Sequence, residues 1–275
     1  MGADIKLLRS RMKSVDSTLH LTSAMGLVAS SKIRRAGEDM FHGREYAAAI
    51  GDMVKVLVSS SECARSPYMN ENSSGQTCMI VIAGDRGLAG GYNANALKLA
   101  SEFSDAEIIS IGKRACERFG GGYSSAEKFS FNNAKKISSD LCGEFLSGKY
   151  TRIGIVYTKY VSMMTQEASV LWLLPLVRDE GSKDGSGNSQ PKASVIFEPG
   201  EQEVFESAVP EYVAGMIYAC TRESVASEVA ARRMAMDSAE KNAREMLSDL
   251  TLSYNRARQG AITQEITEIV AGSEN

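Results

Sequence analysis

The chain has 275 residues, of which 43% are hydrophobic and 24% are charged, as is usual for a globular protein. Its 31 lysines and arginines nearly balance 34 aspartates and glutamates, so overall charge gives no reason to expect a nucleic-acid partner. The apolar runs fall far short of the roughly 18 to 20 residues that a membrane-spanning helix needs. The five cysteines are scattered without a Cys-x-x-Cys pair, and we therefore expect no metal site, no cofactor and no transmembrane segment.

The first element predicted is a long helix over residues 1–62. Apolar or small residues recur from Ile5 to Leu57 in alternating steps of three and four, while charged residues such as Lys13 and Arg35 lie off this stripe. A stripe this narrow is typical of a coiled-coil seam and not of a helix that covers a sheet. The helix should therefore pair with another helix.

Residues 76–200 are predicted to form a compact α/β domain. Apolar β-branched runs predict strands at 78–83, 108–111, 152–158, 170–174 and 194–197, and amphipathic segments predict helices at 95–103, 113–119 and 133–146. Because strands and helices alternate, the sheet should be at least partly parallel. Two polar segments, 66–76 and 179–192, are expected to be surface loops.

A glycine-rich stretch, GDRGLAGG (residues 84–91), follows a predicted strand and precedes a helix, as phosphate-binding loops do. One alternative function is therefore an enzyme that binds a nucleotide here. The stretch lacks the Lys-Ser/Thr pair of a P-loop, and its glycine spacing differs from the dinucleotide-binding fingerprint. We expect Asp85 to pair with Arg86 or to cap a helix, and neither residue to act in catalysis.

A second long helix is predicted over residues 209–275, with Pro210 in its first turn. Its predicted seam is Val225, Val229, Met236, Ala239, Ala243, Met246, Leu250, Ser253, Ala257 and Gly260. Because the α/β domain lies between the two helices in sequence, both helices should leave it from neighbouring points. They would then form an antiparallel coiled coil with the α/β domain inserted at its root. A free-standing scaffold that self-associates through this seam is a further alternative.

The last turns of this helix change their apolar face. Equal helix lengths place the end of the first helix level with about Ile262. At about 100° per residue, Ile266 lies opposite Ala257, with Ile262, Ile269 and Val270 on the same side as Ile266. A stripe of β-branched residues is rarely left in water, so another protein chain should enclose it. The alternative is that this end folds back on its own α/β domain.

Three stretches, in this order along the chain, resemble the gamma subunit of F-type ATP synthase: LTSAMGLVASSKIRRA (21–36), GDRGLAGGYN (84–93) and YNRARQGAITQEITEIVAG (254–272). The resemblance implies a rotor shaft of two terminal helices inside a ring of alternating alpha and beta subunits. A Rossmann-like α/β domain would form the foot, against the epsilon subunit and the membrane c-ring. It also implies a non-catalytic subunit that couples ion flow to ATP synthesis or hydrolysis by rotating, peripheral to the cytoplasmic face of a bacterial plasma membrane.

The resemblance also implies which residues meet partners. Arg258 and Gln259 would meet loops of the beta subunits, and Met25 would lie near their acidic lever segments. Near the C-terminus the implied contact residues are Arg256, Arg258, Gln259, Ile262, Thr263, Gln264, Glu265, Ile266, Ile269 and Val270. The foot-domain loop comprises Asp85, Arg86, Gly87, Gly90 and Gly91. Independently of the resemblance, Arg258 and Gln259 lie off the predicted seam, on the side that Ile262 and Ile266 share.

Overall fold

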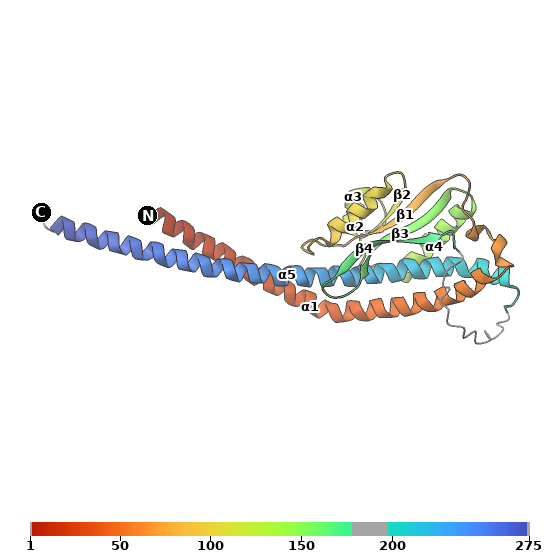
Figure 1. Cartoon of the computed structure of the whole chain (residues 1–275), viewed down its shortest axis with the longest axis horizontal. Helices are drawn as coiled ribbons and strands as arrows, with labels where there is room; N and C mark the ends of the chain where they lie inside the picture. Colours follow the sequence, from red (N-terminus) through yellow and green to blue (C-terminus); the bar gives the residue numbers. More distant parts are fainter. Residues whose placement is uncertain (1, 178–196, 274–275) are drawn as a thin grey trace, which may run out of the picture. The chain divides into compact units, whose positions relative to one another are not determined.

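The computed structural model describes residues 2–177 and 197–273, whose helices and strands are labelled in Figure 1. The chain divides into two compact units: residues 1–32 together with 232–275, here called the helical unit, and residues 33–231, here called the α/β unit. Helices α1 (Gly2–Ser59) and α5 (Glu201–Ser273) each contribute to both units. No helix within the described ranges is long and apolar enough to cross a membrane.

The stripe predicted for the first helix is the buried face of α1. Every predicted stripe position from Ile5 to Leu57 is buried or half-buried. Leu7, Leu21 and Leu27 lie off the stripe and are exposed. The three-and-four spacing therefore correctly identified the face of α1 that packs against another element.

The two helices pair in the antiparallel sense that the sequence predicted. In the helical unit, Ser23 of α1 lies beside Glu240 of α5, and Gly26 lies against Met236. Residue numbers thus rise along one helix as they fall along the other. The helices approach closely at Gly26, where an added Cβ would already be in van der Waals contact with the Cβ of Met236, at 3.6 Å, so the site has no room for a long side chain.

The predicted seam of α5 is wrong by one residue at alternate positions from Met246 to Gly260. Ala243, Leu250 and Ala257 are buried or half-buried as expected. The predicted positions Met246, Ser253 and Gly260 are exposed, and the residues that follow them, Leu247, Tyr254 and Ala261, are half-buried instead. At two of these positions the seam takes the residue with more apolar area to bury, Tyr254 in place of Ser253 and Ala261 in place of Gly260.

In the described part of the α/β unit there is one sheet of four strands, in the order β2-β1-β3-β4. The strands are β1 (Gln76–Ile82), β2 (Glu107–Ile111), β3 (Tyr150–Tyr160) and β4 (Gln166–Leu174). Strand β1 is parallel to β2 and β3, whereas β3 and β4 are antiparallel, so the sheet is partly parallel as predicted. The loop predicted at 179–192 lies outside the described residues, as does all but the last residue of the strand predicted at 194–197.

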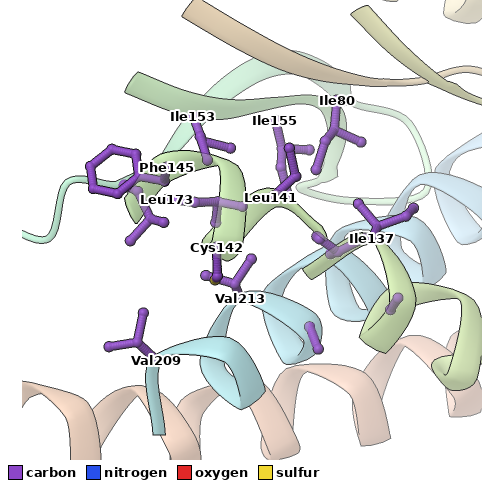
Figure 2. Packing of buried hydrophobic residues seen from close by; sticks show 14 of the residues in the cluster. Ile80, Ile137, Leu141, Cys142, Phe145, Ile153, Ile155, Leu173, Val209 and Val213 are labelled. Atoms are coloured by element: carbon purple, nitrogen blue, oxygen red, sulfur yellow. The ribbon is translucent and has the colours of Figure 1, made fainter. Parts of the chain in front are cut away.

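Helices cover both faces of this sheet. They are α2 (Tyr92–Ala100) and α3 (Lys113–Phe119) on one face, and α4 (Phe131–Leu146) with parts of α1 and α5 on the other. Met79 of β1 faces the smaller cluster under α2 and α3, while its neighbour Ile80 faces the larger one. Figure 2 shows Leu141 of α4 beside Ile155 of the sheet, with Val213 of α5 on the far side of α4. The core therefore joins the sheet to the long helices.

The start predicted for the last helix is wrong, because α5 begins at Glu201 and Pro210 lies inside it. Glu201 and Glu203 occupy the first turn, where the helix dipole favours carboxylates. An interior proline removes one backbone donor, yet Val209 beside it is fully buried, and the carbonyl of Pro210 accepts a 2.5 Å hydrogen bond from Ser138 Oγ. Tertiary packing thus holds the helix through the proline.

The segment 66–76, predicted to be a surface loop, is instead anchored to the core. The Tyr68 ring is buried and stacks on Phe145, with ring centroids 6.3 Å apart. Asn72 Nδ2 donates to the carbonyl oxygens of Phe145 and Tyr150, at 2.9 and 2.6 Å. One aromatic ring and one amide are enough to fix a segment whose composition is otherwise that of a loop.

Candidate interaction surfaces

The C-terminal end of α5 presents an exposed apolar stripe. Ile262, Ile266, Ile269 and Val270 are 47%, 57%, 71% and 54% exposed. Ala261 is half-buried, and each residue from 262 to 270 is exposed. Within the helical unit, the C-terminal end of α5 extends past the N-terminal end of α1 in Figure 1. These four exposed apolar side chains form a candidate contact surface.

Polar side chains surround this stripe. Arg256, Arg258, Gln259 and Glu265 are exposed. Neither arginine forms an ion pair with any residue that the structure describes, so both guanidinium groups can bind an acceptor on a partner. Two local hydrogen bonds, from Thr263 Oγ1 to the carbonyl of Gln259 at 2.9 Å and from Gln264 Nε2 to Glu268 Oε1 at 2.8 Å, hold their side chains against the helix.

Met25 is half-buried in the helical unit, next to a buried glycine. A Cβ on that glycine, Gly26, would lie 3.2 Å from Nη1 of Arg233. Arg233 pairs with Asp237 at 2.9 Å, one turn further along α5. The guanidinium of Arg233 thus covers Gly26, and its positive charge is shared with a carboxylate.

The glycine loop uses its own amides to pack into the α/β unit. The Gly84 amide donates to Asn93 Oδ1 at 2.8 Å, and the Arg86 amide donates to Glu228 Oε1 at 3.4 Å. A Cβ on Gly84 would lie 2.7 Å from the carboxyl carbon of Glu228. A phosphate here would compete for amides already bound and would meet a buried carboxylate, so the arrangement does not favour the nucleotide-binding alternative.

Asp85 caps a helix and does not pair with Arg86. Its Oδ1 accepts hydrogen bonds from the amides of Lys113, the first residue of α3, at 3.3 Å, and of Ala126 at 2.8 Å. Its Oδ2 accepts from Ser125 Oγ at 2.6 Å and from the amide of Glu127 at 3.2 Å. The carboxylate therefore joins the loop to α3 and to the turn at residues 125–129.

The tip of the loop carries a residue that sequence reasoning missed. Leu88 is the one non-glycine residue of the described chain with positive φ, at 59°, and its side chain is 63% exposed. A left-handed backbone costs a leucine about 1–2 kcal/mol. Gly87 and Gly90 flank Leu88 and the buried Ala89, and Gly90 also has positive φ, at 56°. The exposed loop residues are thus Arg86, Leu88, Gly90 and Gly91.

Comparison with known proteins adds to this geometry. A family model described as ATP synthase matches residues 4–275. The ATP synthase gamma chain of Ruminococcus albus is 40% identical over 289 residues, covering 99% of each chain. The sodium ion specific ATP synthase gamma chain of Acetobacterium woodii is 37% identical over 299 residues, covering 100% of this chain and 99% of that one.

Solved structures give the same fold. A chain from the OSCP/F1/c-ring structure of the Euglena gracilis mitochondrial ATP synthase matches with a TM-score of 0.65 and 18% identity. The match covers 98% of this chain and 94% of that chain. A central stalk and c-ring structure from Tetrahymena thermophila matches 80% of this chain and 99% of that chain, with a TM-score of 0.60 and 19% identity.

Proposed function

The chain belongs to the gamma chain family of ATP synthase, and on this basis we propose that helices α1 and α5 form a shaft that rotates within a ring of alternating alpha and beta subunits. As the central stalk of the rotor, it couples ion flow through the membrane c-ring to ATP synthesis or hydrolysis. The observation that carries this proposal is full-length family membership together with an antiparallel pair of helices that ends in an exposed apolar stripe.

The mechanism needs no chemistry on the shaft itself. Two paired helices present different side chains in different directions, so a ring of three equivalent sites meets a different surface at each site. Turning the shaft would change the nucleotide affinity of each site in succession, because affinity follows the conformation that the contact favours. We therefore assign the chain no catalytic residue. The amides of the Gly84–Gly91 loop, which pack against Asn93 and Glu228, support this assignment.

The partner contacts follow from the exposed surfaces. Ile262, Ile266, Ile269 and Val270 would sit in an apolar sleeve of the ring. Arg256, Arg258, Gln259, Thr263, Gln264 and Glu265 would contact the beta-subunit loops around that sleeve, and Met25 would lie near their acidic lever segments. The α/β unit would meet the epsilon subunit and the c-ring. Bacterial relatives support a place at the cytoplasmic face of a bacterial plasma membrane.

Co-purification with candidate partners tests this function. Tagged chain expressed with its alpha and beta subunits should be recovered as one complex that hydrolyses ATP, because the apolar stripe and the shaft are enclosed only in that assembly. Isolation of the chain alone with bound nucleotide and turnover would contradict the proposal in favour of an enzyme. A tight homodimer that excludes alpha and beta subunits would contradict it in favour of a scaffold.

A further inference from the structure

One short stretch of α5, residues 222–228, is buried although most of its side chains are polar or charged. Arg222, Glu223 and Glu228 are 8%, 7% and 5% exposed, and Ser224 and Ser227 are fully buried. Buried polar groups persist where hydrogen bonds compensate for the loss of water. We call these five residues the polar collar.

The first set of collar contacts holds the end of strand β3. Strand β1 pairs with β3 only as far as Val156, and beyond that point no strand among residues 2–177 and 197–273 pairs with β3 on this side. Side chains of the collar take the place of the missing strand. The Thr158 amide donates to Ser224 Oγ and the Thr158 carbonyl accepts from Ser227 Oγ, both at 3.1 Å. The Tyr160 amide donates to Glu223 Oε1 at 2.9 Å.

Helix α1 closes the same ladder. Arg44 Nη2 donates to the Tyr160 carbonyl at 2.9 Å and to Glu223 Oε1 at 2.7 Å, while Arg44 Nε donates to Glu223 Oε2 at 3.3 Å. The hydrogen bond to Glu223 raises the pKa of Arg44, so the guanidinium keeps its charge. A bidentate ion pair between α1 and α5 thus also binds the backbone of the sheet.

The second set of contacts reaches two other segments of the α/β unit. Arg222 donates to the carbonyls of Ala126, Glu127 and Phe129, at 2.8, 3.3 and 2.7 Å. Because the amides of this turn bind Asp85, the turn links the glycine loop to Arg222 through its own peptide groups. At the loop itself, Tyr92 Oη donates to the Ser224 carbonyl at 2.9 Å, and Glu228 accepts from the Arg86 amide.

These contacts leave α5 in several directions. At about 100° per residue, the five collar side chains span about 240° of the helix circumference. The fully buried Val209, Val213 and Ile217 lie within about 80° of one another around α5, so their apolar packing holds one side of the helix only. Hydrogen bonds are directional and weaken steeply when misaligned. A helix held by such bonds on most of its circumference cannot turn without breaking them.

We propose that the polar collar is the joint that locks α5 against rotation about its own axis in the α/β unit, so that torque passes between sheet and helix. The inference rests on the proposed function and adds the positioning residues Arg44, Glu223, Ser224 and Ser227 to it. If the collar only stabilised the fold, its loss would lower the melting temperature of the chain and leave coupling unchanged. A joint must also determine how much ion transport accompanies each ATP hydrolysed.

The test uses the whole ATP synthase in lipid vesicles and the collar variant Glu223→Gln/Ser224→Ala/Ser227→Ala. The control, Glu206→Gln/Ser207→Ala, makes both kinds of change, Glu→Gln and Ser→Ala, at exposed positions of α5. ATP hydrolysis and ATP-driven membrane potential, followed with a voltage-sensitive dye, are measured together. The collar variant should lower the ratio of potential build-up to hydrolysis at least twofold while hydrolysis stays within twofold of wild type. The control should match wild type.

A collar variant with the wild-type ratio would overturn the inference, even if its melting temperature falls. If the triple variant does not assemble, Ser224→Ala and Ser227→Ala are measured singly; a lowered ratio supports the joint, and wild-type ratios in both overturn it. Failure of the proposed function is seen separately, because the wild-type complex would then not assemble or would build no potential on ATP addition.

Discussion

Replacing Ile266 by aspartate is expected to weaken assembly of the chain with its ring without unfolding the chain. Ile266 is 57% exposed in the free chain, so the substitution removes little that the free chain buries. Surface changes of this kind usually alter stability by no more than about 0.5 kcal/mol. The melting temperature of the isolated chain should therefore stay close to that of wild type.

In the assembly the loss is larger. Full burial of an isoleucine contributes about 1.5–3 kcal/mol, so covering the exposed half of Ile266 contributes roughly 1–1.5 kcal/mol. Burying a carboxylate in the same sleeve costs several kcal/mol more, unless a cation pairs with it. Since 1.4 kcal/mol is a factor of ten in affinity, Ile266→Asp should weaken binding by about a hundredfold or more.

The assay is titration of labelled chain into purified alpha and beta subunits, followed by ATP hydrolysis of the complex. Ile266→Leu serves as the control, because it keeps the apolar area and should bind within about threefold of wild type. If Ile266→Asp binds and supports coupling as well as Ile266→Leu, the end of α5 is not enclosed and the reasoning is refuted.

Three further predictions concern the chain alone. Gly122→Ala should destabilise the chain by about 2 kcal/mol or more, because φ at Gly122 is +100° and an added Cβ would lie 2.1 Å from a carbonyl oxygen of β2. Gly143→Ala, in the interior of α4, should instead stabilise the chain by about 0.5–1 kcal/mol. Unfolding in urea measures both changes, and equal effects would contradict the geometry. Leu247→Ala should lower the free energy of unfolding by about 1–2 kcal/mol and Met246→Ala by less than about 0.5 kcal/mol, because Leu247 is half-buried and Met246 is exposed. The reverse order would support the seam predicted from sequence. Burial raises the pKa of Cys78 to about 12, so its thiol should resist iodoacetamide at pH 8 until urea unfolds the chain, and modification at the rate of a free thiol would contradict this burial.

The fold was predictable where one signal decides the structure. The stripe from Ile5 to Leu57 continues without a break, whereas apolar residues off it, such as Leu7 and Leu21, do not form a continuous second stripe, so the spacing predicts the buried face of α1 correctly. In α5 two possible seams compete. Met246 and Leu247 are both apolar, and shifting the seam by one residue at such positions preserves the three-and-four spacing. Only packing against the partner helix chooses between them. Pro210 misled for a similar reason, since the buried Val209 beside it outweighs a local helix-breaking preference.

The candidate surfaces were predictable to different extents. The change of face near Ile262 follows from helix geometry, so the exposed stripe could be located from sequence alone. The polar collar could not, because a run such as Arg222 to Glu228 reads as the solvated face of a helix until its hydrogen-bond partners are known. The conformation of Leu88 was equally hidden, since a leucine gives no sequence signal for a left-handed backbone.

Single-molecule rotation tests the central claim most directly. With the alpha and beta subunits fixed to a surface and a bead attached to the α/β unit at an exposed position, ATP should drive the bead in one continuous direction. Rotation in a single sense, stopping when ATP is exhausted, is the result that a central stalk predicts. Steady ATP hydrolysis by the same complexes while the bead stays still would contradict it.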